Sequence, residues 1–190
     1  TVFLFNHMIL RYLGNDGIIS YTIIAYVNTI VVMSLAGIAQ GAQPMVSFYY
    51  GRGEKKKYMT LLKYGIITSI GLGIIAFAAS IAGADLLVNL FVSRELTGLR
   101  EYSAEVFRTF SFSFLIMGIN IQMGGFFTAV ERPRPALFIS LGRGMVTIAI
   151  ALKLCTMVWG GEGIWISQFV SEILCGIMTA FFIFRYRKTQ

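Results

Sequence analysis

The sequence predicts an all-α fold, a polytopic bundle of membrane helices. Of its 190 residues, 56% are hydrophobic and only 13% are charged, whereas a soluble domain carries about 25% charged residues. The hydrophobic residues form long continuous runs, the longest of them uncharged from Gly17 to Gly51, and about 20 apolar residues suffice to cross a bilayer. Such runs lack the alternation of membrane β-strands, so helices remain as the structure that satisfies the backbone in lipid.

Turn-forming residues divide the N-terminal half into three helices. Residues 1–12 are the end of a helix, because the chain opens inside an apolar run and Gly14-Asn-Asp-Gly17 closes it. The second helix, 17–50, contains the long uncharged run. The third, 58–91, is centred on a further uncharged stretch.

Three more helices fill the C-terminal half. The fourth, 101–130, ends at Glu131-Arg-Pro-Arg-Pro135, because each Pro disfavours helix in the residue before it. The fifth, 135–159, ends at Gly160-Gly-Glu-Gly163, and the sixth covers 163–184. We therefore expect the whole chain to form a single membrane domain, one six-helix lobe with a truncated first helix and missing upstream helices.

Basic residues predict the orientation of this domain. Most of the 16 Lys and Arg residues fall at the helix ends shared by loops 52–57 and 131–135 and by the C-terminus, so these are expected in the cytoplasm, on the inner membrane. Trp159 and Trp165 flank an opposite loop, as in an interfacial aromatic belt. Since the basic clusters alternate with apolar runs, membrane lipids and not nucleic acid are the expected partners. The first set is Arg52, Lys55, Lys56, Lys57, Lys63, Arg132, Arg134, Arg143, Arg185, Arg187 and Lys188, and the opposite ends hold Arg11, Arg94, Arg100, Arg108 and Lys153.

The chemistry of an enzyme or a metal site is not indicated. Cys155 and Cys175 lie in apolar segments without a motif, and His7 has no ligand-type companion at a workable spacing. Asp16 and Asp85 are the only aspartates, too far apart in the pattern for a catalytic pair. We expect no metal and no cofactor, and an intramembrane enzyme or a structural membrane subunit is the alternative of another class.

Polar side chains near the end of the second helix form the first candidate site. Gln40, Gln43 and Ser47 share one helical face, and Pro44 leaves the Gln40 carbonyl without its helical partner. Such groups are costly in lipid, so this face should meet protein or water. A proline kink with interhelical hydrogen bonds and the wall of a cavity both fit.

Glu172 is the second candidate. It lies ~14 Å from the outer end of its helix and ~20 Å from the inner end, and a carboxylate near mid-membrane indicates function by default. Its candidate partners are Arg143 and Lys153 on the neighbouring helix. A buried pair that joins two helices is favoured over an ion-coupling group, which would need access to water.

The fourth helix supplies the third candidate. Asn120 and Gln122 offer hydrogen bonds there, but no acidic residue lies between Glu105 and Glu131. This helix therefore offers polar contacts without an ionisable coupling group.

The segment Gly37-Ile-Ala-Gln-Gly-Ala-Gln-Pro-Met-Val-Ser-Phe-Tyr-Tyr-Gly51 resembles a Gly…Pro…Gly signature of the multidrug and toxic compound extrusion (MATE) transporters, and most closely those of the bacterial multidrug efflux subgroup. Three further features fit the family in the right order: the Gly14-Asn-Asp-Gly17 turn before this segment, and Leu-Phe-Val-Ser-Arg94 and Gly161-Glu-Gly-Ile-Trp165 after it. The resemblance implies the C-terminal half of a twelve-helix antiporter, which exports organic cations or drugs in exchange for H⁺ or Na⁺. Its partner would be an N-terminal six-helix lobe.

The resemblance also implies roles for the candidate residues. The tenth-helix carboxylate of Na⁺-coupled members aligns with Gly118 here, so an acidic residue of the N-terminal lobe is the expected coupling site. Flippases for lipid-linked oligosaccharides or polysaccharides share the architecture and stay as the alternative, but these faces lack the cationic cluster that a pyrophosphate requires. The residues expected to line the substrate cavity are Gln40, Gln43, Pro44, Ser47, Asn120 and Gln122.

Overall fold

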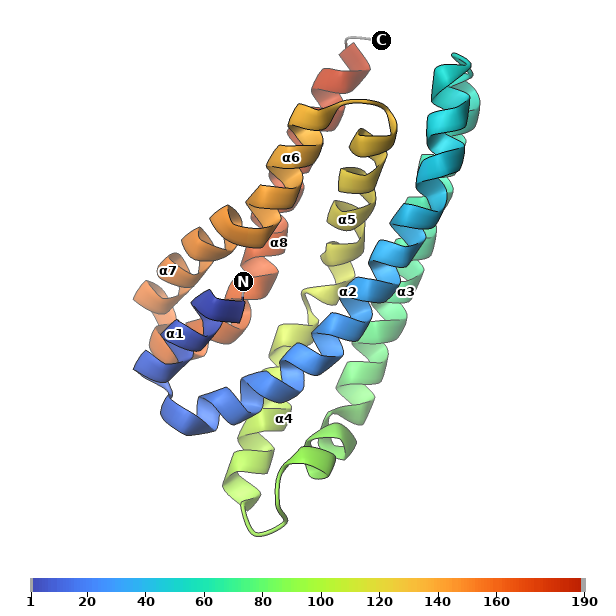
Figure 1. The fold of residues 1–190 in the computed structure, drawn as a ribbon. Coiled ribbons are helices and arrows are strands. Elements are labelled where there is room, and N and C mark those ends of the chain that lie inside the picture. Colours follow the sequence, from blue (N-terminus) through green and yellow to red (C-terminus); the bar gives the residue numbers. More distant parts are fainter. Residues whose placement is uncertain (1, 189–190) are drawn as a thin grey trace.

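A computed structural model describes residues 2–188, with only the backbone of Arg187. Every regular element in this range is a helix, which confirms the all-α prediction, and the helices form an elongated bundle (Figure 1). Thr1, part of the first expected helix, and the Arg187 side chain, part of the orientation argument, lie outside the description. The elements are α1 (Val2–Tyr12), α2 (Gly14–Gly51), α3 (Lys55–Phe91), α4 (Thr97–Ser111), α5 (Phe114–Ala129), α6 (Pro133–Leu141), the π-helical η1 (Gly142–Val146), α7 (Thr147–Trp159), the 3₁₀ turn η2 (Gly160–Glu162) and α8 (Gly163–Lys188).

Long apolar helices make up most of the bundle. Among the described residues, α2, α3 and the stretch from Pro133 to Tyr186 are long and apolar enough to cross a membrane, and α4 with α5 counts as a fourth if the bent pair is one span. The stretch from Pro133 to Tyr186 reverses direction at η2, and α7 and α8 then pack side by side (Figure 1). With the short α1, the bundle has the six arms that the sequence predicts.

Two glycines permit the sharp reversal between α7 and α8. Gly160 has φ +59°, a conformation that side chains rarely adopt. At Gly163, a Cβ atom would lie 2.2 Å from the carbonyl oxygen of Cys155. The two helices can meet this closely only because residue 163 has no side chain.

The expected unbroken helix over 101–130 is wrong. α4 and α5 meet at an angle of 43°, and short i to i+3 bonds occupy the break, such as that from the Ser113 amide to the Phe110 carbonyl at 3.0 Å. The Ser111 hydroxyl donates to the Arg108 carbonyl at 2.7 Å. Serine side chains of this kind compete for backbone groups and bend helices.

Several expected boundaries also shift. The turn predicted over Gly14–Gly17 is shorter in the structure, since α2 already begins at Gly14. The positive φ of 66° at Gly14 lets the chain change direction within this single residue. α3 begins at Lys55, and α6 begins at Pro133, since proline suits the first helical position, where no N–H is needed. These differences lengthen the helices and leave their order unchanged.

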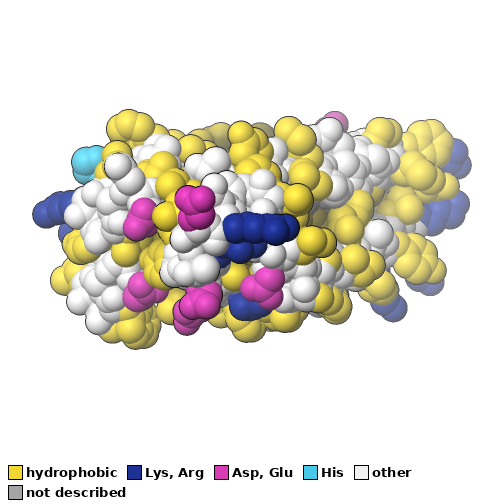
Figure 2. Space-filling model, turned by 90° about the horizontal axis from the view of Figure 1, so that it is seen from below, with side chains coloured by type: hydrophobic (Ala, Val, Ile, Leu, Met, Phe, Trp, Pro, Cys, Tyr) yellow, Lys and Arg dark blue, Asp and Glu magenta, His cyan; other side chains and the backbone are white. Residues whose placement is uncertain are grey.

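The two ends of the bundle differ in charge. The α2–α3 and α5–α6 loops and the end of α8 lie together at one end (Figure 1). There the Glu54 carboxylate contacts Arg52 at 2.6 Å and Lys57 at 2.5 Å, and the hydrogen bond from Lys57, together with both positive charges, lowers the pKa of Glu54. The other end mixes acidic and basic side chains with hydrophobic ones (Figure 2).

Buried aromatic residues form the core of both halves of the bundle. Phe5, Phe107 and Trp165 belong to one cluster, and Phe127 and Tyr186 to the other. Trp165 is only 1% exposed, and its indole N–H donates to the Tyr102 hydroxyl at 3.0 Å. The interfacial role predicted for Trp165 is therefore wrong, because this side chain fills the core.

Candidate functional site

An open hollow of about 280 Å³ lies between α2, α5 and the α6–η1 segment. Apolar and small residues form much of its wall, and polar side chains, all uncharged except Arg143, project between them. The polar residues that line it are Gln40, Gln43, Asn120, Thr128, Ser140 and Arg143.

Small residues on α2 and α5 leave room for the glutamine amides. Ala39 and Gly125 face each other across these helices, and a Cβ atom added at Gly125 would lie 3.1 Å from the Gln43 amide nitrogen and 3.2 Å from the Ala39 Cβ. The Gln43 side chain therefore lies against the backbone of α5. Gln40, one turn earlier on α2, is exposed at the same hollow.

Behind the hollow, Glu172 is fully buried at 0% exposure. Its carboxylate accepts hydrogen bonds from Arg143 Nε at 2.9 Å, Asn120 Nδ2 at 2.8 Å and Gln168 Nε2 at 3.3 Å. Asn120 Nδ2 also donates to the Glu172 carbonyl at 2.9 Å. The charge is thus paired and hydrogen-bonded, as a buried charge requires. Arg143 and Asn120 connect it to the hollow, since both also line that space.

Arg143 belongs to the π-helical segment η1. The Thr147 hydroxyl donates to the Gly142 carbonyl five residues back at 2.9 Å and lies 2.8 Å from the Ser171 hydroxyl of α8. A π-segment admits one extra residue into a turn and occurs often at functional sites. Here it joins α6 to α7 at the level of Glu172.

The structure brings together three of the six residues predicted to line a cavity, Gln40, Gln43 and Asn120. Pro44 is exposed and lies outside the hollow, and α2 continues past this proline without a break. Ser47, one turn further on, donates to the Ala129 carbonyl at 3.0 Å. Both lie beyond the hollow towards the basic end of α2, and their place in the wall of a complete transport cavity stays a prediction.

Gln122 also lies outside the hollow. It is 2% exposed and packs against α3, where a Cβ atom at Gly65 would lie 2.3 Å from its amide nitrogen. Two residues along a helix turn the side chain by about 200°, so Gln122 points away from the direction of Asn120. Gln122 therefore packs between α5 and α3 and does not line this hollow.

Of the two predicted partners of Glu172, the structure places only Arg143 in contact. Lys153 is exposed and lies ten residues further along the α7 arm, ~15 Å at the rise of a helix. The pairing with Lys153 is therefore wrong. Gln168 and Ser140 also belong to the site. The spacing of one helical turn between Gln168 and Glu172 is visible in the sequence and indicates that the two share a face of α8.

The chain is thus a lobe of six helical arms, with an open polar hollow on one side and a buried ion pair behind it. The family model of MatE matches residues 1–153. The chain belongs to the MatE family.

Solved structures agree with this assignment. The outward-facing conformation of a multidrug resistance MATE family transporter of the MOP superfamily matches with a TM-score of 0.88 at 17% identity, over 98% of this chain and 42% of that one. The inward-facing conformation of a multidrug resistance MATE family transporter of the MOP superfamily matches with a TM-score of 0.86 at 17% identity, over 99% of this chain and 44% of that one. A MATE protein in complex with MaL6 gives 0.85 at 16%, over 98% and 43%. The chain spans under half the length of these structures, and no curated protein matches it.

Gly118, where the resemblance to Na⁺-coupled transporters places a carboxylate, is tightly packed. A Cβ atom there would lie 2.9 Å from the Ser69 carbonyl oxygen and 3.0 Å from a Leu35 methyl group. The α5 helix uses this position for close contact with α2 and α3.

Proposed function

We propose that the chain is the C-terminal lobe of a multidrug efflux antiporter, which exports organic cations in exchange for H⁺ or Na⁺ together with an N-terminal six-helix lobe. The observation that carries this proposal is the open hollow, whose wall combines apolar surface with neutral amides. Binding sites for small molecules are mostly apolar, with a few placed polar groups. Adaptable contacts of this kind suit substrates of varied shape.

The charge of the hollow favours drugs over lipid-linked oligosaccharides. Among the described residues that line the hollow, only Arg143 is charged. The Glu172 carboxylate, with Oε1 2.9 Å from Arg143 Nε, balances that charge. A flippase needs several cationic groups to bind a pyrophosphate. A hollow without net charge does not repel an organic cation.

The lobe is suited to alternating access. It matches the outward-facing and inward-facing transporters almost equally well, with TM-scores of 0.88 and 0.86. This supports a lobe that moves as one unit against its partner, as in other transporters built from repeats.

We place the coupling ion in the other lobe. Glu172 already accepts three hydrogen bonds and contacts Arg143, so it offers little capacity for a Na⁺ ion. We further propose that the basic end of the bundle faces the cytoplasm in an inner membrane, because the positive-inside rule predicts this side.

The test replaces Gln43 by Ala in the complete transporter. We expect altered resistance to some drugs, by about fivefold for a lost hydrogen bond of ~1 kcal/mol, at unchanged protein level in the membrane. Ser47→Ala is the matched control, because Ser47 lies one turn further along α2 but outside the hollow. An unchanged profile for every substrate with Gln43→Ala would remove this residue, and with it the hollow, from the drug path.

A further inference from the structure

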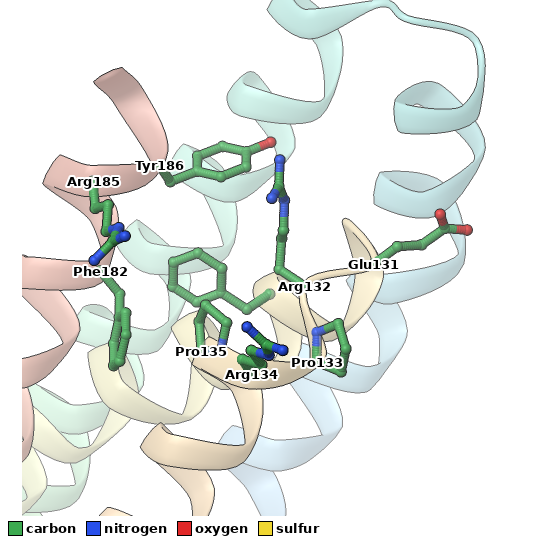
Figure 3. A pocket seen from close by; sticks show the side chains of 9 residues that line it. Glu131, Arg132, Pro133, Arg134, Pro135, Phe182, Arg185 and Tyr186 are labelled. Atoms are coloured by element: carbon green, nitrogen blue, oxygen red, sulfur yellow. The ribbon is translucent and has the colours of Figure 1, made fainter. Parts of the chain in front are cut away.

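A second pocket, of about 450 Å³, opens at the basic end of the bundle, where the α5–α6 loop meets α8. Arg132, Arg134 and Arg185 line it together with Phe127, Phe182 and Tyr186 (Figure 3). The proposed drug hollow does not include any of these residues. The pocket therefore needs its own explanation.

Three arginine side chains concentrate positive charge in this pocket. Among the side chains that the structure describes, no carboxylate lies within ion-pair distance of Arg132 or Arg134. Arg132 lies over the Tyr186 ring, 5.9 Å from its centre. Glu131 also borders the pocket, but its carboxylate points away from the three guanidinium groups (Figure 3). An anion would thus meet several donors at once.

The loop that carries these arginines is held in place. Glu131 adopts φ 56°, and the Arg132 amide donates to the Phe127 carbonyl at 2.9 Å. Holding residue 131 in this uncommon conformation costs free energy. The guanidinium groups of Arg132 and Arg134 therefore start from a fixed backbone.

An apolar surface continues from the pocket along the bundle. Phe138 of α6 stacks on Phe182 of α8 with ring centres 6.0 Å apart. Leu137, Phe138 and Phe181 are exposed by 57 to 59%, on helices that the sequence places in the membrane. A ligand with an anionic head and apolar chains would match both parts.

We propose that this pocket binds the head group of an anionic phospholipid, with the phosphate among Arg132, Arg134 and Arg185 and the acyl chains along the α6–α8 surface. Basic pockets between membrane helices bind anionic lipids in this way, mainly in the cytoplasmic leaflet. The ligand is a lipid and not free phosphate, because the aromatic floor and the exposed Phe138 would contribute nothing to an inorganic ion. The proposal does not depend on drug export.

Native mass spectrometry of the complete protein in detergent tests it, with added phosphatidylglycerol, phosphatidylcholine or inorganic phosphate. We expect phosphatidylglycerol to bind more tightly than the other two. Arg132→Gln/Arg134→Gln should weaken it by about thirtyfold, since each surface charge is worth about fivefold. The control Lys55→Gln/Lys56→Gln removes two exposed charges from the same end and should change binding by less than about threefold.

Three results would overturn the assignment. They are equal binding of both lipids, equal binding of phosphate, or an equal loss in the lysine control, which would indicate general surface charge. Should the double arginine variant unfold, the single variant Arg134→Gln serves, because Arg134 is exposed. About a fivefold loss is then expected, and no loss contradicts the proposal.

Discussion

At the scale of single residues, the polar interior of the lobe converges on Glu172. Three donors from η1, α5 and α8 reach one carboxylate that is 0% exposed. Desolvation makes such a pair of little net value, but removing one partner leaves a buried charge alone. The pair therefore holds three helices in register beside the hollow, and its loss should affect stability before transport.

Glu172→Gln tests this structural role. We expect it to lower the free energy of unfolding by about 3 to 5 kcal/mol, because Arg143 loses its counter-charge. The double variant Glu172→Leu/Arg143→Met should recover most of that loss. Glu105→Gln, at an exposed carboxylate, is the control, and thermal unfolding in detergent is the measurement. A Glu172→Gln protein that keeps its unfolding midpoint but loses ion-coupled transport would make Glu172 a coupling residue instead.

The sequence predicted the Glu172 site only in part. The depth of Glu172 and Arg143 in their helices follows from counting residues, because the rise along a helix is constant. The direction in which a side chain points depends on packing between helices, and Lys153 and Gln122 were misplaced for that reason. A local π-segment such as η1 also leaves the hydrophobic pattern unchanged, so nothing in the sequence predicted it.

At the scale of elements, the α7–α8 hairpin sets the distance between Arg143 and Glu172. Its existence was predictable, because four residues with three glycines separate two apolar runs. The 43° bend between α4 and α5 was not, since Phe110 to Phe114 alternate with serines inside a run that is apolar enough for one helix. Serine hydroxyls fit both a straight and a bent helix, and only the packing decides.

Gly163→Ala should disturb this hairpin. The new Cβ would lie 2.2 Å from the Cys155 carbonyl oxygen, so the backbone of α7 or α8 must shift, at a typical overpacking cost of about 1 to 3 kcal/mol. Gly83→Ala in α3 is the matched control, because a Cβ there meets nothing within 4 Å and alanine favours helix. Thermal unfolding compares the two variants. Equal midpoints would show that the hairpin adapts without cost.

At the scale of the whole molecule, the chain is one lobe with the fold of MatE proteins. The structural match to the outward-facing transporter covers 98% of this chain but only 42% of that transporter. The hollow of the lobe is open on one side. A transport cavity of the proposed kind needs a second lobe to close it. The general architecture can be predicted from the hydrophobic runs and basic loops of the sequence. The identity of the partner lobe and of the coupling ion cannot, because no residue of this chain determines them.

The 190-residue chain by itself should therefore not transport drugs. Without the second lobe it has half of a cavity and cannot alternate between two sides of the membrane. Proteoliposomes containing this chain alone should show no drug-dependent proton or sodium flux, while the complete transporter supplies the positive control. Flux with the isolated chain would mean that copies of it form the second half.

The most direct test of the drug path is protection of the hollow by substrate. In the complete transporter, a cysteine in place of Gln43 reports on the hollow, and one in place of Ser47 reports on the same helix outside it. The native Cys155 and Cys175 are buried and give a low background of labelling. An exported organic cation should slow thiol labelling of Gln43→Cys severalfold and leave labelling of Ser47→Cys unchanged. Equal labelling of Gln43→Cys with and without saturating substrate would contradict this prediction.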